Sequence, residues 1–270
     1  MNNLRRELAP IADAAWSLID EEATRVLKLK LAARKLVDFA GPKGPELAAV
    51  NTGRLEPLKG GPAGVEAGRR QVLPLTELRV AFELSRAELD AVERGSAAPD
   101  LGPVVDAATR IATAEDGAVF HGFAAAGITG IEQASAHAAR PLSTDYSAYP
   151  RSVAEATHLL RQAGIDGPYA IALGPRCYAG LTQATQGGYP VLDVVKRIVD
   201  GPIVWAPAVN GAVVLSTRGG DFELTVGRDL SIGYVGHTDA VVRLYLTESF
   251  TFRVLTPEAA VALMYKEKGR

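Results

Sequence analysis

The chain has 270 residues, of which 47% are hydrophobic and 22% are charged, and its formal net charge is −2. This balance excludes an intrinsically disordered chain, and it lacks the basic excess that is typical of nucleic-acid-binding proteins. Because Cys177 is the only cysteine, a disulfide scaffold is excluded, and a reducing, cytoplasmic compartment fits best. No run of about 18 apolar residues is present, and the N-terminus leads into charged helical sequence, so we expect neither a membrane span nor a signal peptide.

The first predicted element is an amphipathic helix over residues 11–37. Its apolar side chains recur at steps of three and four residues, and Gly41 and Pro42 end the pattern. Residues 41–70 are then dense in Gly and Pro. Such a long, weakly structured stretch is uncommon inside a compact domain. We therefore interpret it as a projecting loop or hairpin arm.

The middle of the chain alternates between strand and helix patterns. Residues 78–84 alternate between apolar and polar side chains, which predicts a half-buried strand, and Ser85 is expected to cap a short helix that ends near Gly95. Residues 101–125 have the periodicity of a second long helix. After a change in composition near residue 127, a compact α/β subdomain is predicted, with helices at 152–164 and 191–199 and strands at 169–173 and 202–206.

The last third of the chain is rich in strand patterns separated by glycines. Five successive strands are predicted, at 212–217, 221–226, 230–234, 240–247 and 250–255. Thr256 and Pro257 then have the residue types of a helix N-terminus, so a final helix is expected after them.

Motifs for catalysis are absent from the sequence. It has no P-loop, no GxGxxG after a strand, no HExxH, no GxSxG and no CxxC pair. The histidines lack metal-ligand spacing, so neither a catalytic nor a metal site is predicted; they are His121, His137, His158 and His237. His121 is interpreted as a packing residue, and acidic neighbours such as Glu115 and Asp116 are interpreted as solvated helix faces.

Cys177 leaves one catalytic alternative open. A thiol paired with a remote histidine would form a nucleophile, but a buried small residue beside Tyr178 is the simpler interpretation. Without a catalytic cluster, a chain with a projecting arm and an inserted subdomain is better interpreted as a structural assembly protein than as an enzyme.

Several short blocks occur in a specific order and spacing along almost the whole chain: residues 4–10 (LRRELAP), 33–38 (ARKLVD), 164–169 (GIDGPY), 188–190 (GYP), 218–222 (RGGDF), 229–234 (DLSIGY) and 248–252 (ESFTF). Together they resemble the encapsulins, the linocin- or bacteriocin-type shell proteins (family 1) of bacterial nanocompartments. The resemblance is specific because many blocks agree at once, whereas a single block would carry little weight.

The resemblance implies an α+β fold, that of the major capsid protein of tailed phages, the Hong Kong 97 type. It has a peripheral domain, an extended loop arm and an axial domain. The expected division is 1–44 for the N-terminal helix of the peripheral domain, 45–75 for the arm, 76–129 for the peripheral domain with its long helix, 130–225 for the axial domain, and 226–270 for the peripheral C-terminal sheet and helix.

The resemblance also implies the function and the partners. Roughly 60 or more identical copies would close into an icosahedral shell, through heterologous contacts whose rotations close. The shell would enclose a dye-decolorising peroxidase or a ferritin-like protein that carries a C-terminal targeting peptide. No catalysis, cofactor, nucleic acid or membrane is expected, and Ala87 stands where an aromatic residue holds flavin in some members.

Two candidate sites follow from the resemblance. The targeting peptide would bind at Leu27, Leu31, Arg34, Asp38, Leu230 and Ile232, and a five-fold pore would be lined by Gln186, Gly187, Gly188 and Tyr189. An apolar groove would supply burial, and the charged pair would orient the peptide. Alternatively, the apolar members are ordinary core and Arg34 pairs with Asp38. A prophage capsid protein and a Cys177-dependent hydrolase remain as competing functions.

Overall fold

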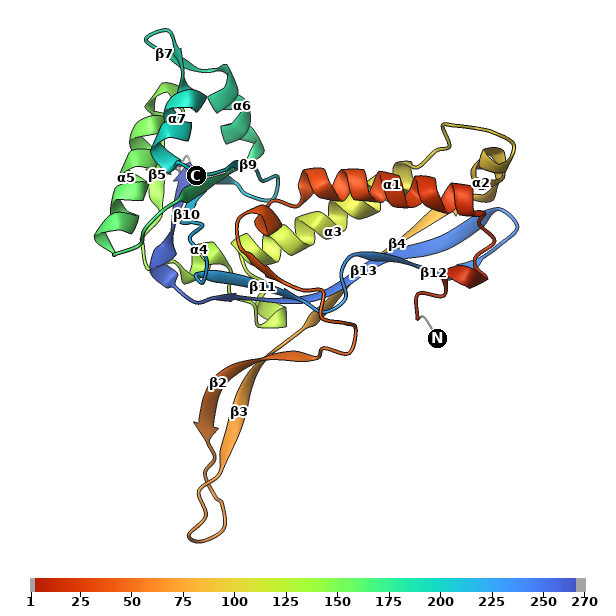
Figure 1. The fold of residues 1–270 in the computed structure, drawn as a ribbon, viewed down its shortest axis with the longest axis horizontal. Coiled ribbons are helices and arrows are strands. Elements are labelled where there is room, and N and C mark those ends of the chain that lie inside the picture. The colour runs from red at the N-terminus through yellow and green to blue at the C-terminus, as the bar shows by residue number, and fades with distance from the viewer. Residues whose placement is uncertain (1–2, 266–270) are drawn as a thin grey trace, which may run out of the picture.

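The computed structural model describes residues 3–265. Figure 1 shows an elongated body with a sheet at each end of it and a hairpin that projects away from the body. The helices are α1 (Asp13–Lys30), α2 (Arg86–Glu93), α3 (Gly102–Phe120), α4 (Ile131–Ala134), α5 (Tyr149–Gln162), α6 (Pro175–Gln183) and α7 (Val191–Val199). The strands are β1 (Asp38–Ala40), β2 (Ala49–Pro57), β3 (Gly68–Pro74), β4 (Thr76–Ser85), β5 (Arg140–Leu142), β6 (Tyr169–Leu173), β7 (Thr185–Gln186), β8 (Tyr189–Pro190), β9 (Ile203–Trp205), β10 (Gly211–Ser216), β11 (Phe222–Val226), β12 (Ser231–His237), β13 (Val241–Val254) and β14 (Ala260–Tyr265).

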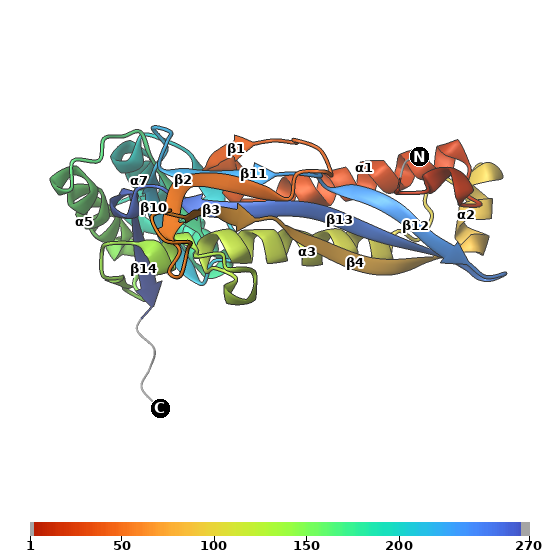
Figure 2. The same ribbon diagram turned by 90° about the horizontal axis from the view of Figure 1, so that it is seen from below.

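The first sheet is organised around the long antiparallel pair of β4 and β13. The register runs from Val241 opposite Ser85 to Phe250 opposite Thr76. The other edge of β13 pairs with β12 and then with β11, and β1 joins β11 in parallel. Figure 2 shows that α1 and α3 both run along this sheet. Their apolar stripes bury one core with it, around side chains such as Ile19, Ile111 and Leu244.

The second sheet has the strand order β5-β14-β10-β6-β9. Every residue of β6 and of β10 is buried. Such continuous apolar runs are typical of strands that are covered on both faces. Helices α5, α6 and α7 pack against this part, and their buried side chains form one continuous core with it.

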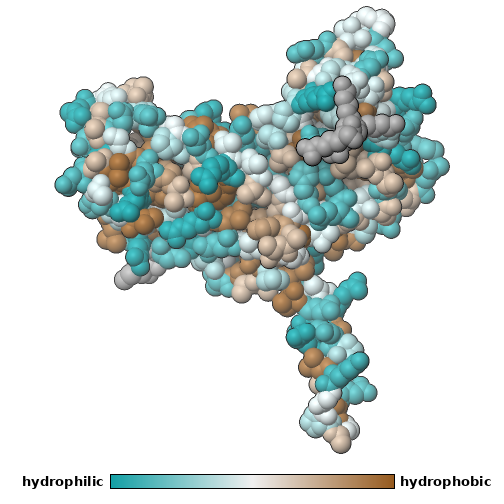
Figure 3. All heavy atoms as spheres, turned by 180° about the vertical axis from the view of Figure 1, so that it is seen from behind, coloured by the Kyte–Doolittle hydropathy of each residue, from teal (hydrophilic) through white to brown (hydrophobic). Residues whose placement is uncertain are grey.

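The hairpin β2–β3 projects from the body. Its two strands pair with each other, with a register irregularity between Asn51 and Leu55. Figure 3 shows hydrophobic and hydrophilic spheres interspersed along it. Several large apolar side chains are exposed there: Leu55, Leu58, Val65 and Val72. The hairpin falls within the residues expected to form the arm, while the division of the chain into peripheral and axial domains stays a prediction.

Two element predictions near the termini are wrong. The first helix ends at Lys30 instead of residue 37, because Leu31 has an extended backbone and the next two N–H groups donate to a buried carboxylate of α3. The expected final helix is a short 3-10 turn, Pro257–Ala259, followed by β14 in the second sheet. Its apolar sequence fits a buried strand as well as a helix, so periodicity alone does not separate the two. Residues 266–270 of that prediction lie outside the described residues.

Further predictions in the middle and the last third need correction. The strands expected at 240–247 and 250–255 are one strand, β13, because a two-residue gap in the apolar pattern is bridged by pairing with β4. Ser85 makes no side-chain cap, since it is a paired residue of β4. Helix α6, which was not predicted, lies between β6 and the β7–β8 hairpin.

Candidate functional site

An apolar groove lies where the C-terminal end of α1 meets the segment that precedes β12. Its volume is about 380 Å³, and it is lined by Thr24, Leu27, Lys28, Leu31, Arg34, Lys35, Asp229 and Leu230. The three leucines form the apolar lining, and the charged side chains surround it. We call this surface the α1 groove.

Four of the six residues predicted for peptide binding line the α1 groove: Leu27, Leu31, Arg34 and Leu230. Ile232 does not line the groove; it lies in the core of the first sheet with 4% of its surface exposed, in the hydrophobic cluster against which Leu27 and Leu230 pack. The role of these residues in peptide binding stays a prediction.

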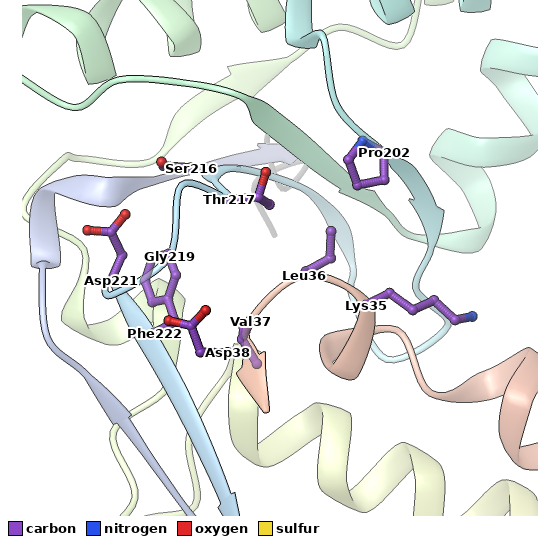
Figure 4. A pocket seen from close by; sticks show the side chains of 10 residues that line it. All are labelled: Lys35, Leu36, Val37, Asp38, Pro202, Ser216, Thr217, Gly219, Asp221 and Phe222. Carbon is purple, nitrogen blue, oxygen red and sulfur yellow. The ribbon is translucent and has the colours of Figure 1, made fainter. Parts of the chain in front are cut away.

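Asp38 lies in a neighbouring pocket of about 160 Å³. Figure 4 shows Leu36, Val37 and Asp38 of the segment after α1 around this pocket, with Thr217 and Gly219 of the β10–β11 connection beside them. The Asp38 carboxylate accepts a 2.6 Å hydrogen bond from the backbone N–H of Gly220. Lys35 lines both this pocket and the α1 groove, so the two openings are neighbours along one segment.

Arg34 is bound by three carboxylates and does not pair with Asp38. Its Nε lies 2.9 Å from both carboxylate oxygens of Glu115, and its Nη2 is 2.5 Å from Glu115 Oε2. Nη1 donates to Asp229 Oδ1 at 2.7 Å, and Nη2 also donates to Glu248 Oε2 at 3.0 Å. The guanidinium carbon lies 5.0 Å from the ring centre of Phe39. These contacts fix the side chain in the groove wall.

The electrostatic surroundings keep Arg34 charged. Burial alone would lower the pKa of its guanidinium, but the hydrogen bonds that it donates to Glu115 and Asp229, together with the charge of Glu115, raise the pKa above its ordinary value. Fork-shaped contact with a carboxylate is the geometry that arginine forms best.

Glu115 and Asp116 are fully buried, which corrects the prediction that they form a solvated helix face. Asp116 accepts the backbone N–H groups of Ala32 and Ala33 at 2.8 and 3.0 Å. Burial raises the pKa of Asp116 to about 7, although these two hydrogen bonds lower it. A signal was present in the sequence, because both residues follow the buried Ile111 and Ala112 at a four-residue step.

The predicted pore loop is a two-residue hairpin between β7 and β8. Gly187 and Gly188 have φ values of 57° and 84°, which is the pattern of a type I′ turn and favours glycine at both positions. All four predicted residues are exposed, and Tyr189 is 74% exposed. Figure 1 shows the loop at the tip of the second sheet's part of the molecule, away from the hairpin arm. Its place at a pore stays a prediction.

In the part of the chain that the structure describes, the hydrogen-bond partners of Cys177 are two tyrosines and not the histidine that the catalytic alternative requires. Cys177 is buried, and its Sγ contacts the hydroxyl groups of Tyr265 and Tyr149 at 3.2 and 3.5 Å. His121 bridges Glu132 and the carbonyl of Ala208, both at 2.8 Å. Within residues 3–265, no group of three or more His, Cys, Asp or Glu side chains could hold a metal ion, and none of the helices could cross a bilayer.

The fold places the chain in a class of proteins. A virus-like particle from Pyrococcus furiosus matches with a TM-score of 0.64 and 16% identity, over 91% of this chain and 98% of that one. A protein of Gordonia phage Cozz matches with a TM-score of 0.59 and 13% identity, over 88% of this chain and 87% of that one. The fold is therefore the Hong Kong 97 capsid type.

The sequence comparisons narrow this class to one family. A family model described as an encapsulating protein for peroxidase matches residues 1–251. The type 1 encapsulin shell protein of Rhodospirillum rubrum is 53% identical over 97% of this chain and 96% of that protein. The chain belongs to the encapsulin family of shell proteins, and this identity disfavours a prophage capsid protein.

Proposed function

We propose that the chain is the subunit of a closed icosahedral shell that encloses cargo enzymes and has no catalysis of its own. The observation that carries this proposal is a capsid fold combined with 53% identity to an encapsulin shell protein over nearly the full length of both chains. A cytoplasmic location belongs to the proposal, because the single cysteine of the sequence suits a reducing compartment.

The hairpin arm supports assembly between copies. A two-stranded hairpin is at best marginally stable by itself, and this one exposes Leu55 and Val72 on its strands. Laid across a second copy, the arm would bury these side chains. A contact of this kind is heterologous, since different surfaces meet, and such contacts generate closed assemblies when their rotations close.

The α1 groove supports cargo binding. Its leucines offer burial to an apolar peptide, and its fixed charges would orient that peptide. We propose that the groove faces the lumen and takes the C-terminal targeting peptide of the cargo, with Asp38 at its far end. The description of the family favours a peroxidase as cargo, and a ferritin-like protein is the second candidate.

The exposed β7–β8 loop supports a pore at the five-fold axis. Gly187 and Gly188 have no side-chain carbon, so the backbones of five copies of the loop could approach closely around an opening.

Expression of the chain alone tests the shell. Light scattering on the purified protein should give the mass of particles with roughly 60 or more subunits. The ultraviolet absorbance spectrum of the same particles should be that of protein free of nucleic acid. A stable monomer or small oligomer would contradict the proposal, and copurified nucleic acid would revive the capsid alternative.

A further inference from the structure

Glu248 has an unusual position for an acidic residue. It lies in the middle of β13 and is fully buried. Its Oε2 accepts a hydrogen bond from Arg34. Its Oε1 is one of two buried side-chain nitrogen or oxygen atoms in residues 3–265 that have no hydrogen-bond partner. A buried carboxylate oxygen without a donor is costly if the group is ionised.

The charges around Arg34 do not balance. The guanidinium faces Glu115 from α3, Glu248 from β13, and Asp229 from the segment before β12. Two further charged groups lie close by, namely Asp116 on α3, which is satisfied by backbone N–H groups, and the exposed Lys35. Two like charges that share one buried site cannot both stay ionised without a large penalty.

The contacts indicate which carboxyl group carries the proton. Glu115 takes the fork-shaped contact with Arg34, so it is the ionised member. Glu248 makes a single contact with Arg34, at the same Nη2 that Glu115 binds more closely, so Glu248 is the more weakly paired of the two buried carboxyl groups. Its Oε1 is the oxygen that is free to hold that proton.

We propose that Glu248 is a protonated positioning residue of the α1 groove, whose neutral carboxyl group accepts from Arg34 without placing a second buried charge beside Glu115 and thereby leaves the contact between Glu115 and Arg34 undisturbed. The part of this inference that concerns cargo rests on the proposed function. The groove wall would then depend on a residue of β13 that does not itself line the groove.

The pH dependence follows from this arrangement. Burial, followed by the charge of Glu115, raises the pKa of Glu248 well above its ordinary value of 4.5. The folded state therefore holds a proton that the unfolded chain releases. The associated stability is present below pH 4.5 and is lost as the pH rises through the folded value. Ionised Glu248 would repel Glu115 and loosen Arg34, so cargo binding should weaken at alkaline pH.

Infrared spectroscopy on intact particles tests the proton directly. At pH 8, wild-type particles should show the carbonyl stretch of a protonated carboxyl group, and Glu248→Gln should remove it. The matched control is Glu77→Gln, the same substitution on the exposed face of the neighbouring strand β4, which should keep the band. Absence of the band from wild-type particles, or its survival in Glu248→Gln, would overturn the protonated state of Glu248.

Cargo capture tests the positioning role. Particles are reassembled at pH 6 and at a pH above the one at which the infrared band disappears, with a fluorescent protein that carries the peroxidase's C-terminal peptide. Wild-type and Glu77→Gln particles should capture several-fold less guest at the higher pH, and Glu248→Gln should flatten this difference. Glu115→Gln should lower capture about tenfold at both pH values.

The outcomes separate this inference from the proposed function. Equal capture by wild type, Glu248→Gln and Glu115→Gln at both pH values would overturn the positioning role. A wild-type shell that captures no guest at either pH would contradict the proposed cargo function and the positioning role with it, while the infrared band would still decide whether Glu248 holds the proton. If Glu115→Gln fails to fold, the positioning role is decided by Glu248→Gln alone: capture that depends on pH as strongly as in wild type would overturn it.

Discussion

The α1 groove and the β7–β8 loop are built in opposite ways. The groove's Arg34 is held by residues from α3, β13 and the segment before β12, and two of those three carboxylates are fully buried. The loop has a two-residue turn whose shape comes from two glycines at positive φ, and the side chains of the flanking Gln186 and Tyr189 are exposed to solvent. The wall of the α1 groove is therefore continuous with the buried core, whereas the β7–β8 loop lies on the surface.

This difference predicts how each surface responds to mutation. Changes behind the groove should alter stability and cargo capture together, because the same side chains serve both. Changes in the loop should leave stability nearly untouched and alter only what passes through the shell. The predictions below test this separation, beginning with the largest effect.

Replacing Glu115 by Ala should give the largest loss of stability. Arg34 would lose its fork-shaped partner while it remains largely buried, and breaking such a pair costs about 3–5 kcal/mol when no other partner is left. Because Asp229 and Glu248 still contact Arg34, we expect a loss near the lower end, about 3 kcal/mol. The denaturant midpoint of the folded chain should fall strongly. A midpoint equal to that of wild type would show that the groove wall is not part of the core.

Replacing Asp116 by Asn should cost about 1–3 kcal/mol, because one backbone N–H of Ala32 or Ala33 would lose its acceptor. It should also change the pH profile. Since burial raises the pKa of Asp116 from 3.8 to about 7, wild-type stability from this group is present below pH 3.8 and is lost as the pH rises towards 7. Midpoints measured from pH 4 to pH 7 should therefore fall less in the variant, and parallel profiles would contradict this.

Replacing Leu230 by Ala should weaken guest capture with a smaller effect on stability, because this side chain is only partly buried and lines the groove. A loss of about 1.4 kcal/mol of binding free energy corresponds to tenfold in affinity. Leu255→Ala, which removes an exposed leucine outside the groove, is the control. Equal capture by both variants would place the peptide elsewhere.

Replacing Tyr189 by Ala should give the smallest change in stability. Its side chain is exposed, so the denaturant midpoint should move by less than about 0.5 kcal/mol, as at other surface positions. The rate at which a small substrate reaches an enclosed peroxidase should change instead. A fall in the midpoint like that of Glu115→Ala would show that the loop belongs to the core after all.

Local sequence patterns predicted the elements with strong periodicity. The strand at 169–173 and the helix at 191–199 lie where they were expected. The C-terminal strand β14 lies where the sequence predicts a helix, because its apolar run suits either structure and only pairing with β10 and β5 selects the strand. The fold class came from the resemblance and not from these patterns, and both the comparisons and the structure confirm it.

Only part of the candidate site could be predicted from the sequence. The leucines and Arg34 of the α1 groove could be named from the resemblance, yet the partners of Arg34 could not, since Glu115 and Glu248 are 81 and 214 residues away along the chain. The buried positions of Glu115 and Asp116 could have been inferred from their place on the apolar stripe of α3. The protonation of Glu248 depends on α3, β13 and the segment after α1 meeting at one place, which no local pattern encodes.

Cryo-electron microscopy of particles loaded with a peptide-tagged guest tests the role of this chain most directly. We predict a closed icosahedral shell with the hairpin arm lying on a neighbouring copy, and with peptide density on the inner wall against Leu27, Leu31 and Leu230. Open aggregates, small oligomers, or a shell whose α1 groove faces outward would contradict it.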